Sequence, residues 1–156
     1  AEVADVLVAR RLLEPQVAQL AALHVTAENL EAMRQTIEEQ RTAVHDRHRF
    51  LALDHRFHLE LARATRNSIV VALTRLLLRH LAVAQEMAVR GPDELERSIA
   101  LHEETLLALE SGDVAAIARA MDAHLSYLEE IWEEETGRAR VHPLPPFLQR
   151  PQAHGD

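Results

Sequence analysis

The residues of this chain best suited to chemistry are its histidines, of which there are ten among 156 residues. His102 stands at the centre of a stripe of apolar residues with helical spacing that runs over residues 95–109. His124 stands at the centre of a second such stripe, over residues 117–131. A histidine in the middle of an apolar stripe points into the core, where it needs a polar partner or a bound ion. Both imidazoles are therefore predicted to be buried.

The spacing of these two histidines predicts more than burial. Residue 113, midway between His102 and His124, falls in the turn formed by Ser111, Gly112 and Asp113. In an antiparallel helical hairpin, residues equally distant from the turn lie at the same height. We therefore expect the two imidazoles to lie side by side in the core.

A third helix offers a matching pair. Asp54 and His58 are four residues apart, so they share one helical face, at the inward edge of an apolar stripe. One carboxylate and three imidazoles can thus converge, and this mixed nitrogen and oxygen set suits Zn, Ni, Co, Mn or Fe better than Ca or Mg. The alternative is that the histidines only pack in the core. The other histidines are interpreted as solvated or packing groups: His24, His45, His48, His55, His80, His142 and His154.

The elements that position these residues are predicted to be helices throughout. The chain has only four Gly and six Pro, and four of the Pro lie in the last fourteen residues, so the rest of the chain has few residues that break helices. Aromatic residues make up 3% of the chain, which is too few for an all-β core. Pro15 is expected to bend the first helix, and Thr26 and Asp113 are expected N-caps. The predicted fold is an all-α antiparallel bundle of about six helices. The expected helices span about 3–24, 27–44, 47–65, 68–89, 93–110 and 114–136.

The composition excludes several classes of protein. There is no Cys, hence no disulfide framework and no thiolate nucleophile, and the net charge of −8 makes the chain itself a poor nucleic-acid binder. No apolar run is judged long enough for a membrane span, and no signal peptide is visible, so a cytoplasmic protein with no membrane partner is expected. The chain starts without Met, which suggests a piece of a longer protein.

Several motifs occur in the order found in one family. The segment 8–15 (VARRLLEP) looks like that family's first helix, and the segment 50–58 (FLALDHRFH) carries its Asp-x-x-x-His. The segment 62–67 (ARATRN) matches the stretch that leads into the family's fourth helix. The family's closing hairpin is matched by His102, the segment 108–113 (ALESGD) and His124. Over about residues 3–136 the chain resembles the C-terminal FCD effector-binding domain of FadR-type GntR-family transcriptional regulators. The expected division is an FCD-like domain over residues 1–136 and a Pro-rich irregular tail over residues 137–156.

The resemblance implies a function and a site. It implies that one divalent transition metal, with Zn or Ni favoured and Mn, Fe or Co as other options, binds a set of four ligands. It also implies a central metal and effector cavity in the bundle, with a small carboxylate effector above the metal. Arg10 and Asn67 are the implied effector-binding residues, and a homodimer is the implied assembly. The winged helix-turn-helix domain that such regulators carry is absent here, so DNA is a partner only through a missing N-terminal domain. The four implied metal ligands are Asp54, His58, His102 and His124.

Two other functions fit the same residues. A metal-dependent hydrolase of the helical-bundle type needs a general base beside the open metal position. Glu103 and Glu104 flank His102 but point to other faces, and no second acidic residue is evidently directed inward, so no enzyme is expected. A plain helical oligomerisation module would use the histidines for packing only.

Overall fold

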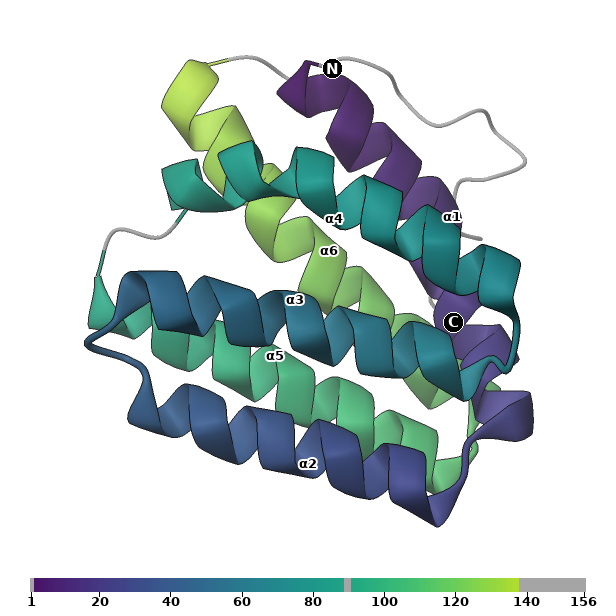
Figure 1. Cartoon of the computed structure of the whole chain (residues 1–156). Helices are drawn as coiled ribbons and strands as arrows, with labels where there is room; N and C mark the ends of the chain where they lie inside the picture. The colour runs from purple at the N-terminus through teal and green to yellow at the C-terminus, as the bar shows by residue number, and fades with distance from the viewer. Residues whose placement is uncertain (1, 89–90, 138–156) are drawn as a thin grey trace, which may run out of the picture.

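The computed structural model describes residues 2–88 and 91–137, and in these ranges it consists of six α-helices without a strand (Figure 1). The all-α prediction is confirmed, and each helix begins and ends within two residues of its expected bounds. The Pro-rich tail predicted from residue 137 onward lies, beyond Gly137, outside the described residues. The helices are α1 (Val3–His24), α2 (Ala27–Thr42), α3 (Arg47–Ala64), α4 (Ser68–Ala88), α5 (Pro92–Ser111) and α6 (Val114–Thr136).

Local capping chemistry explains where the helices begin and end. Thr26 forms a capping box with Asn29 at the start of α2, and the Asp113 side chain accepts from the Ala115 N–H at the start of α6. Gly112 ends α5 in the left-handed conformation, with φ 66°, which a residue with a Cβ rarely adopts. The helix α1 runs through Pro15 as one element. These caps fix the length of the α5–α6 turn on which the register of the two histidines depends.

The helices bury two apolar clusters. The larger one joins α2, α3, α5, part of α1 and part of α6, around side chains such as Phe50, Phe57 and Met121. The smaller one joins α1, α4 and α6 around Leu7, Leu81 and their neighbours. In Figure 1 the helix α3 lies between α4 and α2. The polar site described below lies where the helices of the two clusters meet.

One helix bears on the expectation that the chain has no membrane span, although a single apolar helix is weak evidence for one. Within the described residues, the stretch Ser68–Glu86 of α4 has a mean hydropathy of 1.4 and is long and apolar enough to cross a membrane by length and composition alone. Core helices of soluble proteins pass the same test when most of their surface is buried, but only 33% of this stretch is buried inside the fold. The apolar character of α4 therefore exceeds what its own fold covers.

Candidate metal centre

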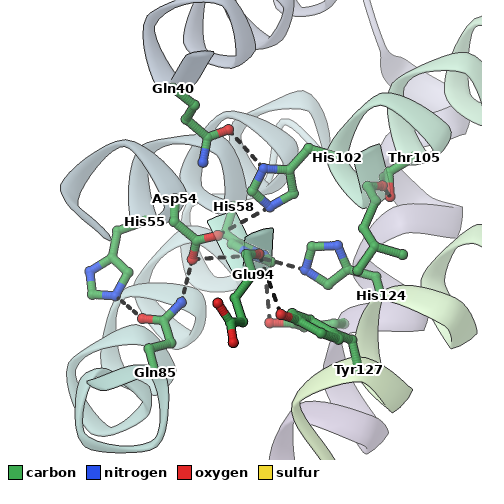
Figure 2. Close-up of polar contacts among 12 residues, drawn as sticks. Gln40, Asp54, His55, His58, Gln85, Glu94, His102, Thr105, His124 and Tyr127 are labelled. Atoms are coloured by element: carbon green, nitrogen blue, oxygen red, sulfur yellow. Dashed lines mark hydrogen bonds and ion pairs between the residues drawn. The ribbon is translucent and has the colours of Figure 1, made fainter. Parts of the chain in front are cut away.

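The structure brings His102 and His124 together as the register predicts. Their rings are stacked, with centroids 5.0 Å apart and planes at 22°, and Phe57 stacks on the other face of His102 at 4.1 Å. The Nε2 atoms of His124 and His58 lie 3.2 Å apart. One potential ligand atom from each of these three histidines lies within 4.8 Å of the others. All three imidazoles are buried and face a common point (Figure 2).

Asp54 completes the group from the same face of α3 as His58. Its Oδ1 lies 3.2 Å from His102 Nε2, and its Oδ2 lies 3.8 Å from His58 Nε2. The carboxylate is 5% exposed, so its charge is shielded from solvent. The four side chains proposed from the spacing of the sequence thus form one buried cluster.

Gln40 on α2 sets the orientation of His102. The Gln40 Oε1 atom lies 2.8 Å from His102 Nδ1, and both side chains are fully buried. A carboxamide oxygen only accepts, so Nδ1–H donates to it and Nε2 carries the lone pair. This contact holds His102 in the tautomer that a metal ligand requires.

A second chain of hydrogen bonds holds Asp54. The His55 Nε2–H donates to Gln85 Oε1 at 2.7 Å, and the Gln85 side-chain amide donates to Asp54 Oδ2 (Figure 2). His55, interpreted from the sequence as a bland residue, therefore positions Gln85. Through Gln85, the helix α4 is tied to the cluster.

The donor set fits a cation better than it fits an empty core. With its proton on Nδ1, His102 directs a lone pair at the Asp54 carboxylate 3.2 Å away, without a hydrogen bond from Nε2. His124 Nδ1 is likewise buried without a hydrogen-bond partner. Two acceptors at this distance repel each other unless a metal ion or an added proton lies between them. The residues present therefore fit a divalent metal.

The protonation states of the cluster favour the same conclusion. Burial lowers the pKa of His58 to about 4, although Glu14 and Asp54 oppose this shift, and burial also lowers the pKa of His124 well below its usual value. Burial raises the pKa of Asp54, but the contact with His102 and the charges of the histidines outweigh it, so that this pKa is held below its ordinary value. At neutral pH, Asp54 is therefore a carboxylate and His58 and His124 are neutral imidazoles, which are the forms that bind metals.

Arg10 and Glu14 of α1 border the cluster. Arg10 is buried and its Nε donates to Glu14 Oε2 at 3.0 Å, while Glu14 Oε1 lies 3.6 Å from His58 Nδ1. The expectation that no second acidic residue is directed inward is wrong, because Glu14 is 5% exposed. A cavity of about 50 Å³ lies against Arg10, Asp54 and His124. Gln85, Glu94, Ser98 and Tyr127 supply the other polar side chains of its lining.

Asn67 does not join this group. It is exposed in the turn before α4, where its side chain accepts from the N–H groups of Ile69 and Val70 at 3.0 and 3.2 Å. Asn67 does not line the cavity beside Arg10, so the effector-binding role implied by the resemblance has no support in its position. The capping of α4 explains an asparagine here.

Sequence reasoning missed three polar residues of the site, namely Glu14, Gln40 and Gln85. A signal existed for Gln40, because it falls on the apolar stripe of α2, three residues after Ile37 and four before Val44. Gln85 similarly follows the buried face of α4, four residues after Leu81. With these residues included, each of the six helices contributes a buried polar side chain to one cluster.

Comparisons with known proteins agree with this architecture. Residues 5–127 match the family model of the FCD domain. Over 73 residues the chain is 41% identical to the Uxu operon transcriptional regulator of Escherichia coli strain K12. The match covers 46% of this chain and 28% of that protein, so the chain spans only a small part of the length of this relative.

Two solved structures share the fold. The E. coli McbR/YncC structure has a TM-score of 0.73 at 16% identity, over 85% of this chain and 65% of that one. A Streptococcus agalactiae GntR structure has a TM-score of 0.70 at 24% identity, over 82% of this chain and 58% of that one. At these identities the likeness establishes the helical architecture alone.

Proposed function

Because this chain belongs to the FCD domain family, we propose that it is the ligand-sensing domain of a bacterial, cytoplasmic GntR-family transcription regulator. The proposal includes an N-terminal DNA-binding domain outside this chain and action as a homodimer. The chain spans 28% of the length of its Uxu operon relative, which leaves length for a second domain in a protein of that kind. The net charge of −8 agrees with a domain that senses a ligand and leaves DNA to another part of the protein.

The observation that carries the proposal is the convergence of three histidines and Asp54 within one buried cluster. Asp54, His58, His102 and His124 would hold one divalent metal, and a mostly imidazole donor set favours Zn or Ni over Mn, Fe or Co. When bound, such an ion supplies positive charge and a coordination position that an anion can occupy. Gln40 and Gln85 would hold two of the ligands in the required orientation.

The effector we propose is a small carboxylate in the cavity beside Arg10. The cavity of about 50 Å³ has room for about three water-sized groups, which favours an acid with few heavy atoms. Arg10 is 4% exposed and would meet the carboxylate with a charge-assisted hydrogen bond in a site of low dielectric. Glu14 would hold the guanidinium in place through the Nε contact. Binding would change helix packing and thereby the spacing of two DNA-binding domains.

The first test is the metal content of the purified chain. We expect about one equivalent of a transition metal in the wild type and its loss in the His102→Ala, His124→Ala double variant. His24→Ala is the matched control, because His24 is exposed at the end of α1 and should leave the metal content unchanged. Absence of metal from the wild type after incubation with Zn and with Ni would contradict the metal site.

The effector is tested separately on metal-loaded protein. A screen of short mono- and dicarboxylates by thermal shift should find acids that stabilise the wild type. Arg10→Gln should weaken binding of such an acid by roughly 10- to 100-fold, the usual worth of a hydrogen bond to a charged group. Equal binding by wild type and variant would remove Arg10 from the effector site while leaving the metal proposal intact.

A further inference from the structure

Glu14 of α1 is a buried carboxylate that has a partner for only one of its two oxygens. Its Oε2 accepts from Arg10 Nε at 3.0 Å, whereas its Oε1 is buried without a hydrogen-bond partner among the described residues. A buried acceptor left in this state is costly, and more so when it carries charge. The imidazole of His58 lies beside this oxygen, with Nδ1 3.6 Å from Oε1. That distance exceeds a hydrogen bond by a few tenths of an ångström.

The two ring nitrogens of His58 face different neighbours. Nε2 lies 3.2 Å from His124 Nε2 and 3.8 Å from Asp54 Oδ2, so it faces the cluster. Nδ1 faces Glu14, which comes from another helix. Glu14 is therefore placed to hold His58 in position and not to bind the metal itself.

We propose that Glu14 is a positioning residue of the metal centre, whose Oε1 accepts a hydrogen bond from His58 Nδ1–H when His58 binds a metal through Nε2. This inference rests on the metal site of the proposed function and extends it by one residue. A histidine that binds a metal through one nitrogen carries its proton on the other, and that proton goes to a carboxylate, a backbone carbonyl or water. Metal binding at Nε2 thus requires the donor that Glu14 Oε1 lacks.

The same contact acts before the metal binds, because neutral His58 carries one proton. With this proton on Nε2, the lone pair of Nδ1 would face a carboxylate oxygen 3.6 Å away, and the two acceptors would repel each other. With the proton on Nδ1, a donor faces the acceptor and Nε2 keeps its lone pair for the metal. Glu14 thereby favours the metal-binding tautomer of His58, as Gln40 does for His102.

The surroundings of Glu14 allow the hydrogen bond to form. A cavity of about 150 Å³ lies against both Glu14 and His58, and most of its lining is apolar, with side chains such as Leu13 and Leu61. The carboxylate has space there for a small movement, and the apolar walls offer His58 few competing acceptors. Because Arg10 holds the other oxygen, one carboxylate serves both the metal ligand and the arginine proposed to meet the effector.

The affinity for Zn, measured by competition against a coloured chelator, separates this role from simple charge balance. Glu14→Gln removes the acceptor's charge and also leaves the Arg10 cation unbalanced near the metal, so it should weaken Zn binding for two reasons. The Arg10→Leu, Glu14→Leu double variant removes both charges of the buried pair, a change that protein cores tolerate. If Glu14 positions His58, this double variant should still bind Zn roughly 10- to 100-fold more weakly than the wild type.

A double variant with the Zn affinity of the wild type would overturn the proposal, because Glu14 would then serve only to balance Arg10. Asp5→Asn is the matched control, since it removes an exposed carboxylate from the same helix and should leave the Zn affinity unchanged. A wild-type protein that binds no Zn would overturn the metal centre itself. Zn binding by the wild type with no loss in the double variant would remove the role of Glu14 alone.

The imidazole N–H resonances give a second measurement, which does not depend on the stability of the variants. In Zn-loaded protein labelled with ¹⁵N-histidine, the His58 Nδ1–H proton should exchange slowly with water and resonate downfield, because a carboxylate accepts from it. In Glu14→Gln, this proton should move upfield and exchange faster. A His58 resonance that is the same in the wild type and in Glu14→Gln would overturn the proposed hydrogen bond.

Discussion

Removal of the Gln40 side-chain amide tests whether the cluster of His102 and its neighbours binds a metal or only packs in the core. In Gln40→Leu, His102 loses the acceptor that keeps its proton on Nδ1, although the volume of the core changes little. The ring is then free to carry its proton on Nε2 and donate to Asp54, 3.2 Å away. That proton blocks the atom that a metal needs.

The expected magnitudes differ for the metal-free and the metal-loaded protein. A lost outer hydrogen bond to a metal-bound histidine typically reduces metal affinity 10- to 100-fold, and we expect a loss in this range. In the metal-free state, the loss of one acceptor is offset by the new His102–Asp54 hydrogen bond. It is offset further because Gln40 Nε2 is itself buried without a partner. We therefore expect the free energy of unfolding in chelator to change by less than about 1 kcal/mol.

The assay is competition for Zn against a coloured chelator, combined with urea unfolding in the presence and absence of EDTA. Gln35→Leu is the matched control, because Gln35 is exposed on the same helix and contacts only Glu31 among the hydrogen bonds found for it. It should leave the Zn affinity as in the wild type. A Gln40→Leu variant with wild-type affinity for Zn would refute the reasoning. A variant that loses several kcal/mol in chelator would show that Gln40 acts mainly on folding.

Three further predictions concern stability. The free energy of unfolding of the metal-free domain should fall by about 3 kcal/mol as the pH falls from 6.5 to about 4. The reason is that the unfolded chain protonates His58 at its usual pKa, whereas the folded chain protonates it only near pH 4. Urea unfolding in chelator at several pH values measures this loss, and an unfolding free energy that stays constant over this range would contradict it. Arg11→Ala should lower the free energy of unfolding by about 2–3 kcal/mol. The Arg11 side chain is only 13% exposed, and it joins α1 to α6 through ion pairs with Asp122 and Glu129. Arg34→Ala removes an ion pair in which the Arg34 side chain is 48% exposed; it is the control for Arg11→Ala and should leave the denaturation midpoint close to that of the wild type. Thr26→Ala should lower the free energy of unfolding by about 1 kcal/mol, because the capping box is lost. A melting temperature equal to that of the wild type would show that this cap does not stabilise the protein.

Local rules predict much of this fold because its helices are long, amphipathic and closely capped. The register of His102 and His124 followed from the turn at Gly112, since the height of a residue in a hairpin depends only on its distance from the turn. Asp54 and His58 followed from helical periodicity in the same way. These are relations within one helix or between two consecutive helices, which the sequence encodes directly.

Relations between distant helices were harder to predict. Glu14 faces His58 because α1 crosses α3, and no local pattern specifies that crossing. Asn67 is a different case, since a residue matched by motif lies exposed at the N-terminus of α4, where its side chain caps that helix. Gln85 reaches Asp54 through the packing of α4 on α3, a contact between residues 31 positions apart. A polar residue on an apolar helical stripe, such as Gln40, therefore indicates a buried polar site just as a histidine at such a position does.

The helix α4 connects the polar cluster to the outside of the fold. Its inner face carries Gln85, which holds Asp54, and its outer face carries exposed apolar side chains such as Leu76 and Val83. A ligand that shifts Asp54 must therefore move α4 or break the Gln85 contact, and a rigid helix transmits such a movement along its length. By linkage, an effector that changes the dimer affinity by some factor has its own affinity changed by dimerisation by the same factor.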